Sequence, residues 1–473
     1  MANQQPGPTV PTFRFLQSYV EAESSFATGG TAYPLAAGAR RTISAKITTK
    51  APTEDVEHAQ GTLSHLDDAI AMPDTCQAEW EGYAIPSGTI STAPDVDTDL
   101  TSGGWNKVDG GGSTTIAASP SSTTTTLEVA DASSIAANTF VVVNNASDGA
   151  DYLRFVTASD LGTPGQLTVT PPLPFTPATS DTVKEGVTYN VDDDRDDDEA
   201  SFQFWAGLNR ILKRAQGVAP TSWALSIGGA TAPRLRWSGP ARRGDDLLWT
   251  TINEGGNFSS GDLTLTVADG NVVPDDVSTS NPYYLLIEDS GNGEEVVKVT
   301  AVSGNDLTVV RAQLSTSDVT HSDGSTIVPY MPDGTYAGSV ISPRGGEAHL
   351  GTAECQLLNG SLTVEMPLET RENVHGDDYA LKGYVSDRIN ATVELEVVAR
   401  TEAVATMALG SRRTTVAVLA YVGSVEGGFA AFYAPKVLFE WPELDFSQRE
   451  VRIPLSGKCR GKSGADEVYL GFA

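Results

Sequence analysis

Cysteine, lysine and long apolar runs are all scarce in this 473-residue chain. Its three cysteines, Cys76, Cys355 and Cys459, lie far apart and form no CxxC pair. That pattern argues against a disulfide framework and against a zinc site, so we expect buried free thiols. No stretch approaches the roughly 18 apolar residues of a membrane span. The N-terminus also lacks the basic and apolar regions of a secretory signal.

Basic residues are also few, because 61 acidic side chains accompany only 31 basic ones and the formal net charge is −30. Binding DNA or RNA requires cationic side chains that displace the counterions of the phosphates. The composition therefore excludes a protein that binds nucleic acid tightly. Two interpretations of the acidity stay open. It repels a nucleic acid that the protein surrounds, or it keeps the surface soluble at high salt.

The clearest internal signal is a repeat of about 65 residues. Four blocks of residues 123–186 (TTTTLEVADASSI, YLRFVTASD, GQLTVTPPL and SDTVKEG) have counterparts in the same order within residues 262–330 (DLTLTVADGNVV, EVVKVTAVSG, NDLTVVRAQL and GSTIVPY). Two-residue alternation bounded by Gly, Pro, Asn and Asp is typical of short strands. The repeat therefore predicts two similar small β-modules.

A weaker repeat lies outside these modules. Residues 199–215, EASFQFWAGLNRILKRA, place Phe202, Trp205 and Leu208 on one apolar stripe, which predicts a helix. Residues 401–410 predict a shorter one. A strand follows each candidate, and then Ala232-Pro233-Arg234-Leu235 aligns with Ala434-Pro435-Lys436-Val437.

The order of these elements predicts two copies of one larger β-fold, each with a single helix. The strand-rich C-terminal part favours antiparallel sandwiches. The predicted fold class is mainly β, with duplicated sandwich domains and two inserted modules. We expect a first sandwich domain at residues 1–115 and 187–250, modules at 116–186 and 251–335, and a second sandwich domain at 336–473.

The sequence offers little for catalysis or cofactor binding. SGKCRGKSG at 456–464 misses the spacing of a phosphate-binding loop, and the expected helix is replaced by a predicted strand. His58 and His65 lie near carboxylates but lack a third nearby histidine for a metal site. No hydrolase or metalloprotease motif is present. We therefore expect no enzymatic activity and no cofactor.

The stretch VDDDRDDDE at 191–199 concentrates seven carboxylates around Arg195. It fails as an EF-hand, because a glycine at position six and a glutamate at position twelve are missing. A loose cation site at Asp192, Asp194, Asp196 and Asp198 is the alternative. The favoured interpretation is a hydrated junction that starts the helix at 199–215, with Arg195 moderating the repulsion.

The C-terminal pattern resembles the tail tube proteins, or major tail proteins, of tailed phages. The resemblance is carried by LLNGSLTVEMPLE, the helix candidate TEAVATMALG, APKVLFEWPELDFSQREVRIPLSGKCRG and the closing strand DEVYLGFA. It covers roughly two thirds of the chain, leaving out the modules, and rests on pattern rather than on an invariant motif. It implies a β-sandwich flanked by a helix.

The resemblance further implies a structural virion protein, made in the host cytoplasm, whose rings stack into a hollow tube for genome delivery. Some members fuse two tube domains, so that three chains build a pseudo-sixfold ring, an arrangement that the internal repeat would fit. A ring of six chains is the alternative. Implied partners are other copies of the chain and the terminator, tape measure and baseplate or distal tail proteins. DNA would pass through the lumen without specific binding. A β-rich adhesin that binds glycans is the alternative.

Overall fold

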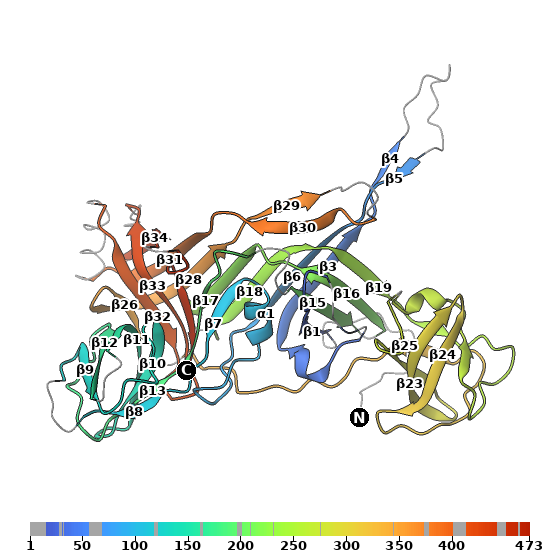
Figure 1. Cartoon of the computed structure of the whole chain (residues 1–473), viewed down its shortest axis with the longest axis horizontal. Helices are drawn as coiled ribbons and strands as arrows, with labels where there is room; N and C mark the ends of the chain where they lie inside the picture. Colours follow the sequence, from blue (N-terminus) through green and yellow to red (C-terminus); the bar gives the residue numbers. More distant parts are fainter. Residues whose placement is uncertain are drawn as a thin grey trace, which may run out of the picture.

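The computed structural model describes most of the chain. The described residues are 16–27, 31, 33–55, 69–117, 122–160, 164–195, 201–208, 210–229, 231–274, 276–343, 345–372, 378–400, 413–441, 451–461 and 464–473. Within them the fold is almost entirely antiparallel β (Figure 1). The helical elements there are α1 (Asp97–Thr101) and two short 3-10 turns. The predicted mainly-β class with sandwich domains and modules is confirmed.

A first sandwich is built from two sheets. One has the order β19-β16-β15-β1-β2, with β1 Leu16–Ala22, β2 Ala39–Arg40, β15 Phe202–Leu208, β16 Ile211–Val218 and β19 Arg243–Leu247. The other has the order β3-β6-β18-β17, with β3 Thr42–Lys50, β6 Thr75–Tyr83, β17 Ser222–Gly228 and β18 Arg234–Ala241. Between them, the rings of Phe202 and Phe204 pack edge-on against buried Trp237.

A second sandwich repeats this plan. Its strands are β26 Ala348–Leu350, β27 Ala353–Cys355, β28 Leu357–Glu365, β31 Asn390–Val398, β32 Val416–Val422, β33 Ala430–Phe439, β34 Arg452–Cys459 and β35 Tyr469–Phe472. They pair in the orders β35-β33-β32-β26-β27 and β28-β31-β34-β33. Because β33 is long, its first half corresponds to β16 and its end to the start of β17. The strand orders of the first sandwich therefore occur twice.

Two irregularities confirm that the copies correspond strand by strand. The β3–β6 register shifts between Thr42 and Ser44, and the β28–β31 register shifts between Leu357 and Asn359. The β15–β16 and β32–β33 hairpins likewise share one bulge, at Phe202/Phe204 and at Val416/Val418. A bulge bends a strand in a specific way, so its repetition at matching places marks equivalent positions.

These bulges correct the alignment of the Ala-Pro pairs. Ala434 pairs with Val418 directly after the bulge, as Ala215 pairs with Phe204. Ala434 is therefore the counterpart of Ala215, and the predicted match to Ala232 is wrong. Similar dipeptides misled the alignment because strand pairing, and not local sequence, decides which positions are equivalent.

Both sandwiches share one continuous sheet. Strand β17 pairs with β28 over seven residues, from Ser222 opposite Glu365 to Gly228 opposite Asn359. The result is a run of eight strands, β3-β6-β18-β17-β28-β31-β34-β33. In each half a two-stranded hairpin interrupts the matching connection, β4–β5 (Thr53–Asp55 and Ala69–Ala71) and β29–β30 (Leu368–Glu372 and Leu381–Ser386). Both lie on the same side of the molecule (Figure 1).

The two modules are six-stranded sheets with one topology. The first has the order β8-β13-β10-β11-β12-β9, with β8 Ser113–Thr115, β9 Thr126–Val129, β10 Thr139–Asn145, β11 Ala150–Asp160, β12 Gly165–Thr170 and β13 Thr182–Glu185. The second has the order β20-β25-β22-β23-β24-β21, with β20 Thr250–Thr251, β21 Thr264–Thr266, β22 Tyr283–Asp289, β23 Gly293–Ser303, β24 Asp306–Gln313 and β25 Thr326–Pro329. They lie at opposite ends of the molecule (Figure 1).

The helix predicted at 199–215 is wrong. Its described residues form the hairpin β15–β16, in which Leu208 pairs with Ile211. Phe202 and Phe204 face the sandwich core, while Trp205 and Leu212 face a second core shared with the second module. A strand buried on both faces loses its two-residue alternation, and its aromatic residues then imitate helical spacing. The helix predicted at 401–410 lies outside the described residues.

Candidate assembly surface

The eight-stranded run buries one face and leaves the other open. Trp80, Trp237 and Trp223 point into the core from neighbouring strands and are at most 1% exposed. The residues between them point to the open face. One complete cross-strand row reads Ser44, Glu81, Arg236, Ala224, Thr363, Thr392, Lys458 and Leu438. The open face is therefore a continuous, mostly small and polar surface that crosses both sandwiches.

The open face carries both signs of charge. Its acids include Glu79, Glu81, Glu365, Glu394 and Glu396, and its bases include Lys46, Arg234, Arg236, Arg452 and Lys458. Equivalent ion pairs recur in the two halves: Arg234 lies 3.1 Å from Glu81, and Arg452 lies 3.2 Å from Glu396. The net charge of −30 is therefore not concentrated on this surface.

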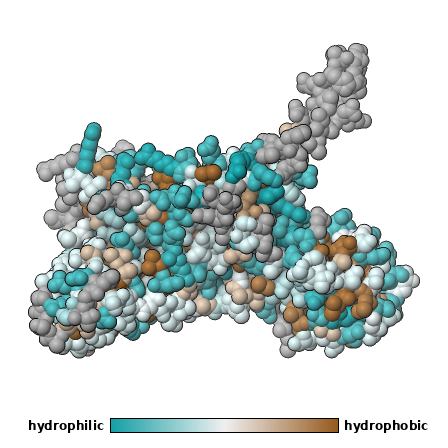
Figure 2. All heavy atoms as spheres, in the orientation of Figure 1, coloured by the Kyte–Doolittle hydropathy of each residue, from teal (hydrophilic) through white to brown (hydrophobic). Residues whose placement is uncertain are grey.

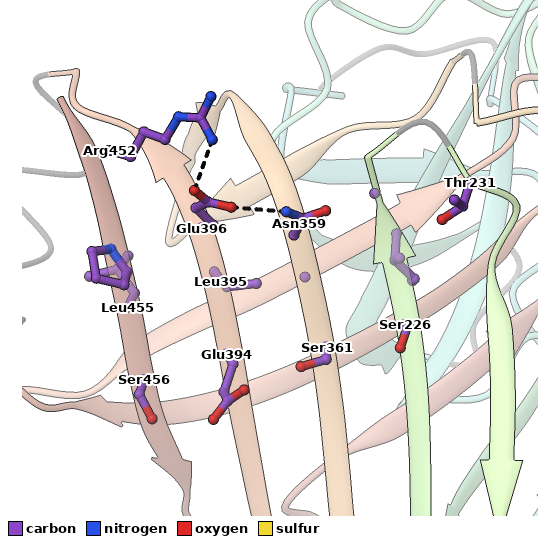
Figure 3. Close-up of a pocket in the computed structure, with 14 residues that line it drawn as sticks. Ser226, Thr231, Asn359, Ser361, Glu394, Leu395, Glu396, Arg452, Leu455 and Ser456 are labelled. Carbon is purple, nitrogen blue, oxygen red and sulfur yellow. Dashed lines mark hydrogen bonds and ion pairs between the residues drawn. The ribbon is translucent and has the colours of Figure 1, made fainter. Parts of the chain in front are cut away.

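A hollow of about 720 Å³ lies on the second half of the open face, between β17 and β34. At its rim the amide of Asn359 donates to one oxygen of Glu396 across 2.9 Å, and Arg452 pairs with the other (Figure 3). The hydrogen bond from Asn359 and, to a smaller extent, the one from Arg452 lower the pKa of Glu396. Serines 226, 361 and 456 line the floor. This lining is mostly polar, and its residues present no nucleophile paired with a base.

One edge of the open sheet has no partner strand among the described residues. Strand β3 pairs only with β6 there, although its counterpart β28 pairs on both sides. Lys46 and Lys50 are exposed on β3, and lysines on an edge strand discourage indiscriminate pairing. At the other end, β33 leads into Glu440, whose N–H donates to the Ser456 carbonyl. The β17–β18 pair Ser222–Ser238 occupies the matching place in the first half.

The acidic stretch lies at the boundary between the two sandwiches. The N–H of Asp192 donates to the Gly104 carbonyl, and the N–H of Asp194 donates to the Asp192 side chain. In the described part of the chain no three or more His, Cys, Asp or Glu side chains are placed to hold a metal ion. Asp196 and Asp198 lie outside the described residues.

Arg195 has a structural role that the sequence did not predict. The guanidinium is buried, donates to the Pro220 carbonyl across 2.9 Å and lies over the Tyr384 ring at 5.1 Å. Its own carbonyl accepts the N–H of Ser386. Arg195 therefore ties the first sandwich to the β29–β30 hairpin of the second. The strand β15 that follows also removes the helix start that the acidic stretch was expected to provide.

The structure describes two of the remaining sequence candidates, the cysteines and the glycine-rich stretch at 456–464. All three cysteines are buried free thiols, as predicted. Burial raises the pKa of Cys76 to about 11 and that of Cys459 to about 12, so both stay protonated at neutral pH. The glycine-rich stretch at 456–464 begins on β34, and the next described element is strand β35 rather than a helix. His58 and His65 lie outside the described residues.

Sequence reasoning missed a buried ionic cluster in the second module. Arg311 pairs with Glu295 through two hydrogen bonds of 2.8 and 2.7 Å, and His321 lies 3.0 Å from the same carboxylate. The three side chains are at most 4% exposed. Burial works to raise the pKa of Glu295, but the bonds from Arg311 and His321 lower it to about 2. The residues are scattered in sequence, so no spacing signal marked them.

The first module has no counterpart of this ionic cluster. Strand pairing places Tyr152 and Pro171 of the first module at the positions of Glu295 and Arg311. The first module instead docks through aromatic rings, with Phe155 stacked on Tyr433 at 4.1 Å. The second module also exposes apolar side chains, at Val310 and Leu314, and apolar surface gathers on it in Figure 2.

Comparison with known proteins adds no assignment: the chain matches no family model and no curated protein. Among the described residues, no helix has the length and apolar character needed to cross a membrane.

Proposed function

We propose that this protein is a tail tube subunit of a tailed virus, which self-assembles into stacked rings around a channel for the genome. The observation that carries the proposal is the β17–β28 junction. There, two copies of one sandwich unit join edge to edge within a single chain and extend one sheet across both. A ring needs that same contact repeated between chains, and the outer edge of β3, which no other described strand covers, supports such a repeat.

The dimensions of the sheet suit a ring of three chains. Strands in a sheet lie about 4.8 Å apart, and strands in closed barrels tilt by about 40°. Three runs of eight strands would then close a barrel whose backbone diameter is on the order of 45 Å. A barrel of that width leaves a lumen that admits a DNA duplex after side chains are added. Two sandwiches per chain would give the ring pseudo-sixfold symmetry.

In this proposal the open face lines the channel. Its small polar residues and mixed charges offer no basic track for phosphate groups, so the genome would slide without counterion release. The wall is mixed rather than acidic, and the hypothesis of an acidic lumen fails for this face. Adaptation to high salt stays the other interpretation of the net charge. The modules, attached at the ends of the molecule, would project outside the tube.

The proposal places the protein in the virion tail, with other copies of itself and the terminator, tape measure and distal tail or baseplate proteins as partners. We infer no enzymatic role for it. Negative-stain electron microscopy of the purified protein tests the proposal. Rings or tubes with a central hole are the expected result, at salt concentrations that screen the negative charge. A protein that stays monomeric across salt and protein concentrations would overturn it.

A further inference from the structure

The duplicated sandwich specifies how two chains should meet, residue by residue. This inference rests on the proposed ring assembly and deepens it. Within the chain, the β17–β28 junction places Ser222 opposite Glu365 and Trp223 opposite Val364. If each half is a copy of the other, the contact between chains repeats this junction with the counterparts of the same residues.

The counterparts follow from the strand pairings. On the β28 side, the shared bulge makes Ser44 the counterpart of Asn359, so Lys50 is the counterpart of Glu365 and Thr49 that of Val364. On the β17 side, Ser222 pairs with Ser238 on β18. Ser238 and Ser456 occupy equivalent places, because they pair with Glu79 and Glu394.

Glu440 is therefore the counterpart of Ser222, because the β33–β34 register that sets Leu438 opposite Lys458 and Phe439 opposite Gly457 sets Glu440 opposite Ser456. Trp441, the next residue, is the counterpart of Trp223. We propose that Glu440 and Trp441 of one chain, which directly follow β33, pair with β3 of a second copy in the register that sets Glu440 opposite Lys50 and Trp441 opposite Thr49. The partner is a second copy of this chain.

Two independent observations support this register. The first is charge: the pairing brings an exposed glutamate against an exposed lysine, and opposite charges directly across strands are favourable. A slip by one residue would point the two side chains to opposite faces of the sheet. The second is exposure: Trp223 is 1% exposed at the internal junction, whereas Trp441 is 65% exposed. Aromatic residues are enriched in the buried core of interfaces, so a large exposed aromatic residue on a contact surface typically becomes buried on association.

A cysteine cross-link tests the register directly. In the Lys50→Cys/Glu440→Cys variant the two thiols lie at opposite ends of the eight-stranded run, separated by seven spacings of about 4.8 Å within one chain. A disulfide between them therefore has to join two copies. The expected product after oxidation is a covalent ring that migrates as a closed oligomer on a non-reducing gel. Either single cysteine variant serves as the control and should give no such product.

Charge reversal gives a second readout that needs no oxidation. Lys50→Glu and Glu440→Lys should each abolish rings at a concentration at which the unmodified protein assembles, and the double variant should restore them. Arg236→Glu is the matched control, because Arg236 lies on the same face on β18, with β6 and β3 on one side of it and five strands on the other. Rings without a cross-link and without charge rescue would overturn this register and leave the tube function standing. Failure of the unmodified protein to form rings would overturn the function itself.

Discussion

Arg452 pairs with Glu396 across 3.2 Å in the second sandwich, at the position where Arg234 pairs with Glu81 in the first. The two pairs stand on equivalent strands, β34 and β31 in one half and β18 and β6 in the other. Side chains on the open face have thus kept their partners through the duplication. The two halves of the open face therefore share a side-chain arrangement, which is why we treat this face as the functional surface.

Removing the buried arginine of the second module should destabilise that module strongly. Arg311→Met leaves Glu295 buried without its principal partner, and breaking a buried ion pair costs about 3–5 kcal/mol. Urea unfolding followed by pulsed hydrogen exchange would detect the loss in peptides of β23 and β24. The control, Arg452→Ala, removes an exposed pair and should cost less than about 1 kcal/mol. Equal effects of the two substitutions would contradict the assigned burial.

Acid should unfold the second module before the first. The pKa of Glu295 is depressed to about 2 in the folded state from an ordinary value of 4.5. A carboxyl whose pKa is lower in the folded state than in the unfolded state stabilises the fold at pH values above its unfolded-state pKa. The stabilisation by Glu295 is therefore lost as the pH falls from 4.5 toward 2. Urea unfolding between pH 6 and pH 2.5 should show this loss. Glu295→Gln should flatten the pH dependence of β23 and β24, and an unchanged profile would count against the cluster.

The buried carboxyl of Glu23 should have the opposite effect on stability from that of Glu295. Glu23 accepts hydrogen bonds from Ser201 and from the N–H groups of Ala27 and Gly217, and its burial raises its pKa to about 7. The folded state then holds a proton that the unfolded state releases above pH 4.5, so stability falls as the pH rises from 4.5 through 7. Glu23→Gln should remove that fall in the free energy of unfolding. Glu79→Gln, on the exposed face, should leave it in place.

Truncating one aromatic ring should loosen the first module from the second sandwich. Phe155 is 1% exposed and contacts Tyr433 and Tyr469, so Phe155→Ala should cost about 3–5 kcal/mol. Faster hydrogen exchange in β10 and β11, with the core strands of the second sandwich unchanged, is the expected result. Thr157→Ala, at an exposed site on the same strand, is the control. Unchanged exchange in the Phe155 variant would argue against docking through this ring.

The sequence by itself determined the mainly-β class. It also located strands whose side chains alternate between core and solvent: the predictions around β28, β31 and β34 match because one face of each is buried and the other is open. It found the module repeat for the same reason. Cys76, Cys355 and Cys459 were correctly expected to be free thiols, because an odd number of scattered cysteines without a CxxC pair argues against a disulfide framework.

Tertiary structure alone decided the rest. Phe202 and Trp205 belong to a strand because two cores cover its two faces, a fact that local spacing does not contain. Ala434 corresponds to Ala215, and Glu440 to Ser222, because hydrogen-bonded neighbours fix strand register and those neighbours come from distant parts of the chain. A sequence lists residues along one strand at a time. The proposed assembly surface needs eight strands side by side, and only the fold provides that arrangement.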